Sequence, residues 1–318
     1  MYVTKKQALL AKASTVPGAS NAIEAYDLDF KFATSILARD NATKRSFGSM
    51  PHAIAMRYGV VTFKTPLRVS GSPSGGTQEL EKPLWEACGF TMANAASDTT
   101  IVCAADMNGS SLDAYLKFYH DGLMRALTSC RGRINRISAP VGELGWIEWE
   151  FWGILTDDGS AEAIPADIED YFPTTKHQPV HGATYTIGGS TYTVRRTEIK
   201  LASELVITKK HTDTSHGGIG TPTLVDRPED GWAGEVQIEE PAIGTKDFYA
   251  DVLINNPAIA QMIIYIGSGA DLVTQLTINM QWDSIKNQSE QKIQDLVLPF
   301  RLRETAGNIN NQFSAILT

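Results

Sequence analysis

The sequence predicts an all-β protein with short flanking helices, built as two tandem β-sandwich domains. Three observations predict it. Apolar and polar residues alternate with period two over most segments, which places successive side chains on opposite faces of a strand. Clusters of Gly, Pro and Asp separate these segments. The same order of elements then occurs twice, so we infer an internal duplication: strand, long polar loop, strand, short helix, hairpin and two further strands.

The first domain is predicted to span residues 21–158. Its first strand, 22–34, places Tyr26, Phe30 and Phe32 on one face. The helical spacing of apolar residues predicts a helix over 77–90, and Asp121-Gly122 predicts a tight hairpin. The other strands of this domain are predicted at 58–69, 100–105, 112–120, 123–128, 131–138 and 146–155.

A proline-containing linker over 159–182 is predicted to join this domain to a second one, 183–318. Residues 1–20 are predicted to be an N-terminal arm that orders only against a partner, in preference to a helical turn over 8–13. The second domain has a helix predicted at 247–253, and its strands are predicted at 184–187, 191–206, 234–239, 261–266, 272–280, 294–303 and 312–317.

Composition narrows the class of function. The net charge of −8 argues against a surface that grips nucleic acid tightly, because phosphate affinity comes largely from Lys and Arg. The three cysteines lack C-x-x-C spacing, which favours buried reduced thiols in a protein made in a cytoplasm. The six histidines show no metal-ligand spacing, so no metal or cofactor is expected. We also expect no secretory signal and no membrane span.

The sequence predicts no enzyme. It contains no Walker loop, no G-x-G-x-x-G and no H-E-x-x-H. His216-Gly217-Gly218 is similar to an esterase oxyanion loop, but no G-x-S-x-G elbow accompanies it. Glu148 and Glu150 could be paired carboxylates of a glycosidase, yet they lie on one predicted strand with nothing that suggests a sugar cleft.

Several motifs follow one another in an order typical of one family. A Gly- and Ser-rich segment, 70–76, precedes the helical stretch L-W-E-A-C-G-F at 84–90, and a hairpin over 115–132 ends in L-T-S-C-R-G. The segment G-W-I-E-W-E-F-W-G follows at 145–153, and D-R-P at 226–228 and L-P-F-R-L at 298–302 continue the pattern. With these motifs the chain resembles the major tail tube proteins of long-tailed, siphovirus-like bacteriophages, with a duplicated tube domain.

The resemblance implies a structural virion protein. Single-domain relatives form hexameric rings whose inner sheets join into one continuous ring barrel, so a duplicated version would form a trimeric, pseudo-hexameric ring. Stacked rings would conduct DNA through the tail without binding it specifically. The implied partners are further copies of the chain, a tape-measure protein, a tail terminator and distal tail proteins. The implied location is the virion tail, after assembly in the host cytoplasm.

Two long loops are candidates for contacts between rings. The first loop spans 38–57 and the second spans 208–231. Loops of this length usually bind something or lack structure, and we favour docking between subunits over a loop without a partner. The candidate inter-ring residues are Arg39, Asp40, Lys44, Arg45, Lys209, Lys210, Asp226 and Arg227.

Four carboxylates are candidates for the wall of the channel: Glu148, Glu150, Glu235 and Glu239. Each alternates with apolar residues along a predicted strand, so it could give the lumen a negative surface that repels phosphate. An ordinary solvated strand face explains the pattern equally well. The nearby Arg131, Arg133 and Arg136 could pair with acidic residues of an adjacent subunit or with phosphate, but we favour solvated charges at the rim.

The alternative function is a carbohydrate- or receptor-binding β-sandwich protein of a virion. That function requires tryptophans exposed on a concave face, and the sequence concentrates aromatic residues at Trp146, Trp149, Phe151 and Trp152. We interpret these residues instead as core and subunit contacts.

Overall fold

The structure is a computed structural model of the chain. The residues that it describes are 7–37, 53–67, 77–94, 99–109, 112–166, 168, 180, 184–201, 203–209, 219–225, 231–241, 246–253, 258–266, 274–290, 293–305 and 311–317.

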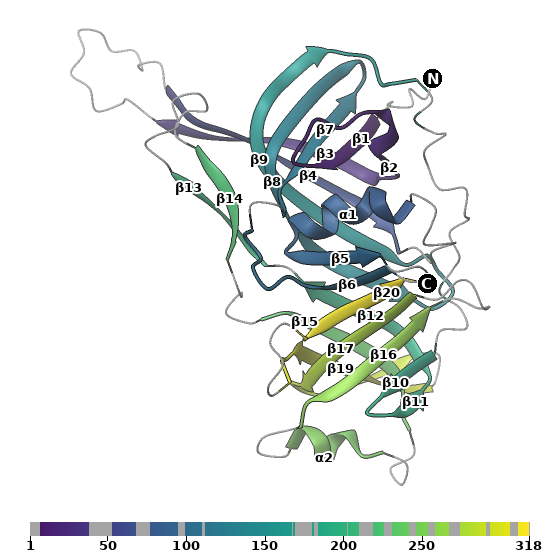
Figure 1. Ribbon diagram of the computed structural model, residues 1–318. Helices are drawn as coiled ribbons and strands as arrows, with labels where there is room; N and C mark the ends of the chain where they lie inside the picture. The colour runs from purple at the N-terminus through teal and green to yellow at the C-terminus, as the bar shows by residue number, and fades with distance from the viewer. Residues whose placement is uncertain are drawn as a thin grey trace, which may run out of the picture.

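The described residues form mainly antiparallel β-structure with two short α-helices (Figure 1). The elements of the first half are β1 (Gln7–Ala13), a 3-10 turn η1 (Ala19–Asn21), β2 (Ala22–Ile23), β3 (Tyr26–Leu37), β4 (Ala53–Pro66), α1 (Thr77–Ala87), β5 (Phe90–Asn94), β6 (Thr99–Cys103), β7 (Ala114–His120), β8 (Leu123–Pro140) and β9 (Trp146–Ala161). Those of the second half are β10 (Thr184–Ile187), β11 (Ser190–Tyr192), β12 (Val194–Leu201), β13 (Glu204–Lys209), β14 (Ile219–Val225), β15 (Ala233–Glu239), α2 (Phe248–Leu253), β16 (Ala260–Ile266), β17 (Thr274–Trp282), β18 (Lys286–Glu290), β19 (Ile293–Leu302) and β20 (Phe313–Leu317).

One continuous sheet of eight strands runs through both halves. Its order is β3–β4–β9–β8–β12–β15–β19–β18, and every pair in it is antiparallel. The first four strands belong to the first half and the last four to the second. The halves meet where β8 pairs with β12, with Ile137 opposite Ile199. Each half therefore contributes four neighbouring strands to this eight-stranded sheet.

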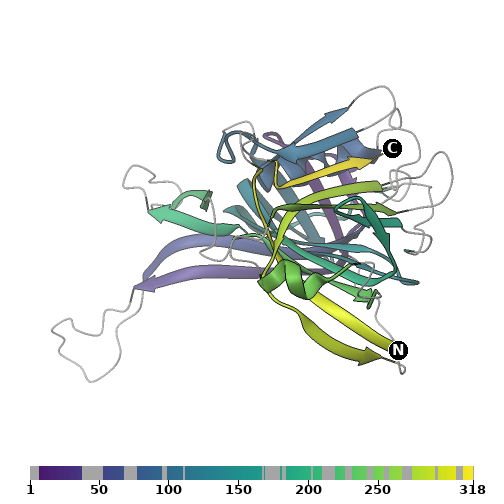
Figure 2. The ribbon, with the colours of Figure 1, turned by 90° about the horizontal axis from the view of Figure 1, so that it is seen from below.

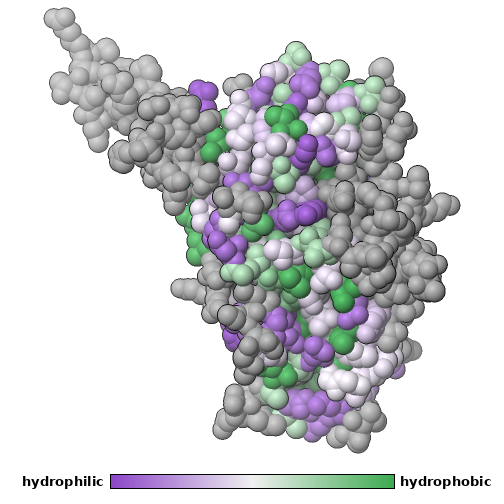
Figure 3. Space-filling model, in the orientation of Figure 1, coloured by the Kyte–Doolittle hydropathy of each residue, from purple (hydrophilic) through white to green (hydrophobic). Residues whose placement is uncertain are grey.

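A second layer covers one face of the eight-stranded sheet. It contains β2–β1–β7, which joins the first part of β8, and the series β5–β6–β20–β17–β16–β10–β11. Pairing of β6 with β20 again connects the two halves. Helix α1 lies at the front of Figure 1 and inserts Trp85 against Trp149 and Phe313. In Figure 3 polar and apolar residues are interspersed over the described part of this layer's outer face.

Two β-ribbons extend from one side of the molecule (Figures 1 and 2). One is formed by the ends of β3 and β4, which continue to Leu37 and resume at Ala53. The other is the separate two-stranded sheet β13–β14. The Asn108 side chain fixes β14, because it donates to the carbonyl of Leu224 at 2.8 Å and accepts from its amide at 2.9 Å.

The prediction of a mainly β fold with short helices is confirmed. Helix α1 lies within the predicted 77–90 segment. The hairpin at Asp121-Gly122 is also confirmed, with positive φ at both residues, as a two-residue turn of this type requires. Among the described strands, however, the eight-stranded sheet is open, because β3 pairs only with β4 and β18 only with β19.

The prediction of a free N-terminal arm is wrong for residues 7–13. These residues form β1, which pairs along its whole length with β7 and also with β2. Leu9 and Ala11 pack into the main core, whereas Ala8 and Leu10 pack into a smaller apolar cluster on the other side. Because both faces are buried, the strand lacks the alternation by which the other strands were predicted.

Three smaller expectations are also corrected. The predicted loop 208–231 contains the end of β13 and the whole of β14, and strand β9 continues to Ala161, into the predicted linker. The two strands predicted between residues 123 and 138 are one long strand, β8, with positive φ at Ser129. The predicted domain boundaries themselves remain predictions.

Candidate assembly surface

The face of the eight-stranded sheet that points away from the core carries a network of charged side chains. Strand alternation creates it: Ile147, Trp149 and Phe151 of β9 enter the core, and Glu148 and Glu150 point to the opposite face. The same alternation on β8, β12 and β15 adds charged residues from both halves. We call this face the charged face.

One ionic network crosses the junction between the halves. Glu148 of β9 contacts Arg136 of β8 at 2.7 Å and Lys64 of β4 at 3.7 Å. Arg136 also contacts Glu198 of β12 at 3.2 Å, and Glu198 contacts Arg196 on its own strand. Arg136 therefore joins a carboxylate of the first half to one of the second.

The pKa values of this network reflect the pairing. Hydrogen bonding to Glu148 is the main cause that raises the pKa of Arg136. Burial raises the pKa of Glu198, but Arg196 and Arg136 outweigh this effect and lower the pKa below its ordinary value. Glu198 is therefore held as an anion by its neighbours.

A second cluster surrounds Glu150. Its carboxylate accepts hydrogen bonds from Arg133 at 3.0 Å, Asn135 at 3.2 Å and the Trp152 indole at 2.7 Å. Burial raises the pKa of Glu150, but these three donors lower it by more. Glu150 is therefore held as an anion, and its charge is balanced by Arg133.

The four predicted carboxylates lie on the charged face, Glu239 at its exposed margin. Glu148 and Glu150 are brought together with basic partners that the sequence did not pair with them, so this part of the face does not present a uniformly negative wall. Whether these residues line a channel remains a prediction.

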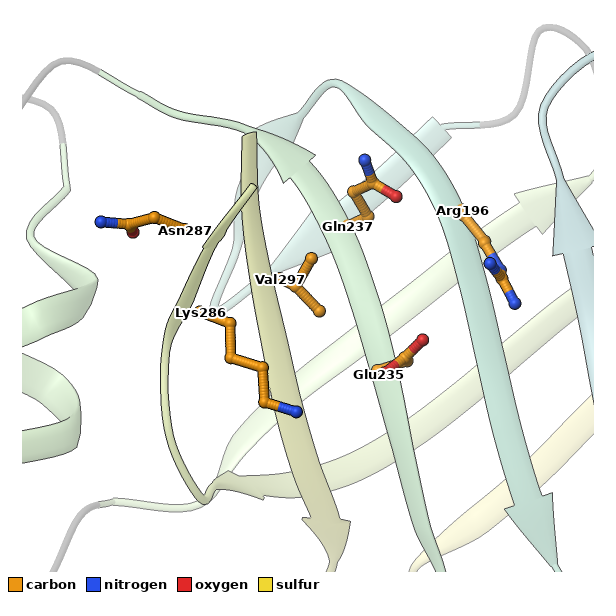
Figure 4. A pocket seen from close by; sticks show the side chains of 6 residues that line it. All are labelled: Arg196, Glu235, Gln237, Lys286, Asn287 and Val297. Carbon is orange, nitrogen blue, oxygen red and sulfur yellow. The ribbon is translucent and has the colours of Figure 1, made fainter. Parts of the chain in front are cut away.

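A pocket of about 350 Å³ opens on the charged face of the second half (Figure 4). Its lining comes from four adjacent strands: Arg196 of β12, Glu235 and Gln237 of β15, Val297 of β19, and Lys286 and Asn287 of β18. In Figure 4 the Glu235 carboxylate lies between the strands that carry Arg196 and Lys286. Among the described residues no ion pair holds Glu235.

The two edges of the eight-stranded sheet differ from its centre in exposure. On β3, Phe32 is 51% exposed and Tyr26 is 40% exposed. Phe30 and Phe32 contact each other edge to face, and Arg125 lies 5.1 Å from each ring centre. On β18, Lys286 and Asn287 are exposed. The exposed aromatic side chains are on β3, and an exposed apolar edge strand such as β3 favours pairing with another chain.

The remaining predicted site residues divide into two groups. Lys209 ends β13, and its side chain is outside the described part of the structure. The other inter-ring candidates lie outside the described residues altogether: Arg39, Asp40, Lys44, Arg45, Lys210, Asp226 and Arg227.

The prediction that Arg131 is a solvated rim charge is wrong. It is 3% exposed, contacts Asp113 at 2.8 Å, and donates to the carbonyls of Met107 and Gly109. Burial lowers its pKa, an effect that Asp113 partly offsets. The arginine faces the core because Ser129 shifts the register just before it. It is a structural residue that anchors the segment before β7.

The aromatic residues of β9 separate onto two faces. Trp149 is 1% exposed and donates from its indole to the Thr65 hydroxyl at 2.8 Å, and Phe151 is also buried. The predicted core role is confirmed for these two residues. Trp146 and Trp152 are half-buried on the charged face, where they contact Tyr26 and Tyr58.

Within the described residues, no cluster of three or more His, Cys, Asp or Glu side chains could hold a metal ion. No described helix has the length and apolar character needed to cross a membrane. Comparison of the chain with models of known protein families gives no match, and no curated protein matches it.

Proposed function

We propose that this chain is the major tail tube subunit of a long-tailed bacteriophage, a structural protein without catalytic activity. Its copies form trimeric, pseudo-hexameric rings that stack into the channel through which DNA leaves the capsid. The observation that supports this proposal most is the eight-stranded sheet, in which each half supplies four neighbouring strands and both edges lack a partner among the described strands.

Closure of that sheet gives the ring. Three copies of eight strands make 24 strands, which are six repeats of a four-strand unit. Three junctions are the β8–β12 pairing inside each chain, and the other three join β18 of one copy to β3 of the next. Closing the sheet satisfies the backbone groups of both edges, which otherwise invite uncontrolled association.

The charged face suits a surface past which DNA slides. Arg136 and Arg133 are each committed to carboxylates at 2.7 Å and 3.0 Å, so they are poorly available to phosphate. These arginines neutralise Glu148 and Glu150 in turn, which leaves interleaved charges of both signs in this part of the face. Such a surface does not bind the DNA backbone strongly.

The two ribbons support stacking. β3–β4 and β13–β14 extend from the same side of the molecule (Figure 2), where each could reach an adjacent ring. The inter-ring candidates of the two predicted loops stay part of the proposal. So do a tape-measure protein in the channel, a tail terminator and distal tail proteins at the ends, and the virion tail as the location.

The experiment is electron microscopy of the purified protein over a range of concentrations. We expect hollow tubes whose end-on projections have threefold symmetry with six similar lobes. Dispersed monomers at high concentration would contradict the proposal. A glycan array tests the alternative of a carbohydrate-binding virion protein, which the burial of Trp149 in the core already disfavours.

A further inference from the structure

Resting on the proposed function, we propose that β18 of one copy pairs with β3 of the next in the register that β8 and β12 adopt within one chain. Asp29 then lies opposite Gln288 of the next copy and beside its Lys286. The junction between copies thus repeats the junction between halves, residue by residue.

The two halves can be aligned strand by strand through their pairings. By position in the eight-stranded sheet, β3 corresponds to β12, β4 to β15 and β9 to β19. β8 corresponds to β17 followed by β18. The β7–β8 ladder ends with Ala114 opposite Cys130, and the β16–β17 ladder ends with Ala260 opposite Met280. The strand order is therefore the same in both halves.

Two independent routes give the same correspondence for the edge strand. The inner route follows the pairings across the eight-stranded sheet. In the first half, Phe151 lies opposite Val61, which lies opposite Phe30. In the second half, Phe300 lies opposite Gly234, which lies opposite Ile199. If the two buried phenylalanines correspond, Phe30 corresponds to Ile199, and its neighbour Asp29 to Glu198.

The outer route starts from the small hairpins. The outermost pair of β1–β2 is Leu9 with Ile23, and that of β10–β11 is Tyr185 with Tyr192. Asp29 follows Ile23 at the same separation at which Glu198 follows Tyr192. Both routes therefore match Asp29 with Glu198, although one uses the eight-stranded sheet and the other starts from the second layer.

The same alignment matches the facing strand. Ile147 opposite Ile137 corresponds to Leu296 opposite Asn287, so Arg136 corresponds to Lys286 and Ser138 to Gln288. Within the chain, Ser138 lies opposite Glu198, and Arg136 contacts that carboxylate at 3.2 Å. At the junction between copies, the contact equivalent to Arg136–Glu198 is an ion pair between Lys286 of one copy and Asp29 of the next.

The charges on the two edges fit this pairing. Asp29 contacts only Lys31 of its own strand among the described residues, at 3.2 Å and with both side chains largely exposed. Lys286 lacks the equivalent of Glu148, because Val297 stands at that position. A carboxylate from the next copy supplies the anion that Glu148 and Glu198 supply to Arg136.

The apolar side fits as well. Leu201 of β12 is 2% exposed because the first half covers it, whereas the corresponding Phe32 of β3 is 51% exposed. A neighbouring copy placed in the same register covers Phe32. Continuity of the sheet, the charges and the exposure thus indicate one occupant for this edge, a second copy of the chain.

Cysteine cross-linking tests the register. The variant carrying Asp29→Cys and Gln288→Cys should form disulfides between copies upon oxidation, giving linked dimers and closed trimers on a non-reducing gel. The matched control carries Ala33→Cys with Gln288→Cys, four residues away along β3, and should stay unlinked. Background should be low, because Cys88, Cys103 and Cys130 are buried.

Each outcome has a distinct meaning. If rings form but the control pair cross-links, or neither pair does, the register is wrong and the proposed function stands. If neither the wild type nor the variants assemble at any concentration, the proposed function fails and this inference with it. A charge exchange adds a second readout: Asp29→Lys and Lys286→Asp should each raise the concentration needed for assembly at least about threefold, and the double variant should restore it.

Discussion

Replacing Arg136 by Met should destabilise the unassembled subunit by about 1–2 kcal/mol at neutral pH. Met retains an apolar side chain that can follow the path of the arginine stem, so the change mainly removes the cation. Removing one partner of a fully buried pair typically costs about 3–5 kcal/mol, and exposed pairs contribute about 1 kcal/mol or less. The Arg136 side chain is 36% exposed and that of Glu198 is 9% exposed, which places this pair between the two cases.

Two remaining contacts limit the loss. Glu148 keeps Lys64 at 3.7 Å, and Glu198 keeps Arg196. We therefore expect a loss of about 1–2 kcal/mol, which is below the range of a fully buried pair and at or above that of an exposed one. The assay is urea unfolding of the wild type and the variant, monitored by tryptophan fluorescence, at a subunit concentration too low for assembly.

The pH dependence separates charge from packing. Because the folded-state pKa of Glu198 lies below its ordinary value of 4.5, its contribution to stability is complete above that value. This contribution disappears as the pH falls through the folded-state pKa. The difference between Arg136→Met and wild type should therefore shrink below about pH 4. An equal difference at pH 7 and at pH 3.5 would refute the ionic explanation. Lys82→Met, which removes an i,i+4 surface pair with Glu86, is the control and should cost a few tenths of a kcal/mol.

Three further predictions concern the rest of the fold. Asn108→Ala removes both hydrogen bonds to Leu224. In hydrogen exchange the amides of β14 should exchange about tenfold faster, and in urea unfolding the global stability should fall by about 1 kcal/mol or less. Unchanged exchange would show that Asn108 does not hold β14 in place. Gly132→Ala places a Cβ about 2.4 Å from the Phe151 ring and should cost about 1–3 kcal/mol in a thermal melt, and a neutral result would mean that the ring moves freely. Burial raises the pKa of Cys130, so a thiol reagent at pH 8 should leave it unmodified in the folded protein and react upon unfolding.

Local patterns in the sequence were sufficient for most individual elements. The alternation around Glu148 and Glu150 predicted β9, and it correctly placed Trp149 on the opposite face. Helical spacing located α1, and Asp121-Gly122 located the β7–β8 turn. These signals lie within one strand, helix or turn, so residues close in the chain determine them.

The missed features depend on partners distant in the chain. β1 has no alternation because it is buried on both faces, and β18 reads as a polar loop because its sequence is K-N-Q-S-E. The pairing of β6 with β20 joins segments about two hundred residues apart, as the contact from Cys103 Sγ to the Phe313 carbonyl illustrates. The link from Glu148 to Glu198 was missed for the same reason, since only the pairing of β8 with β12 brings Arg136, the partner of Glu148, next to Glu198.

The repetition of the halves is incomplete, and the differences bear on how a ring would form. Inside the chain the halves share two strand pairings, β8 with β12 and β6 with β20. Between α2 and β16 the described residues contain no strand equivalent to β6, so the proposed junction between copies would have only the β18–β3 pairing. That junction also replaces the Arg136 bridge between two carboxylates with a single Lys286–Asp29 pair. A ring of three copies would therefore alternate strong and weak junctions and would open at the weak ones, which keeps the subunit as a folded unit before assembly.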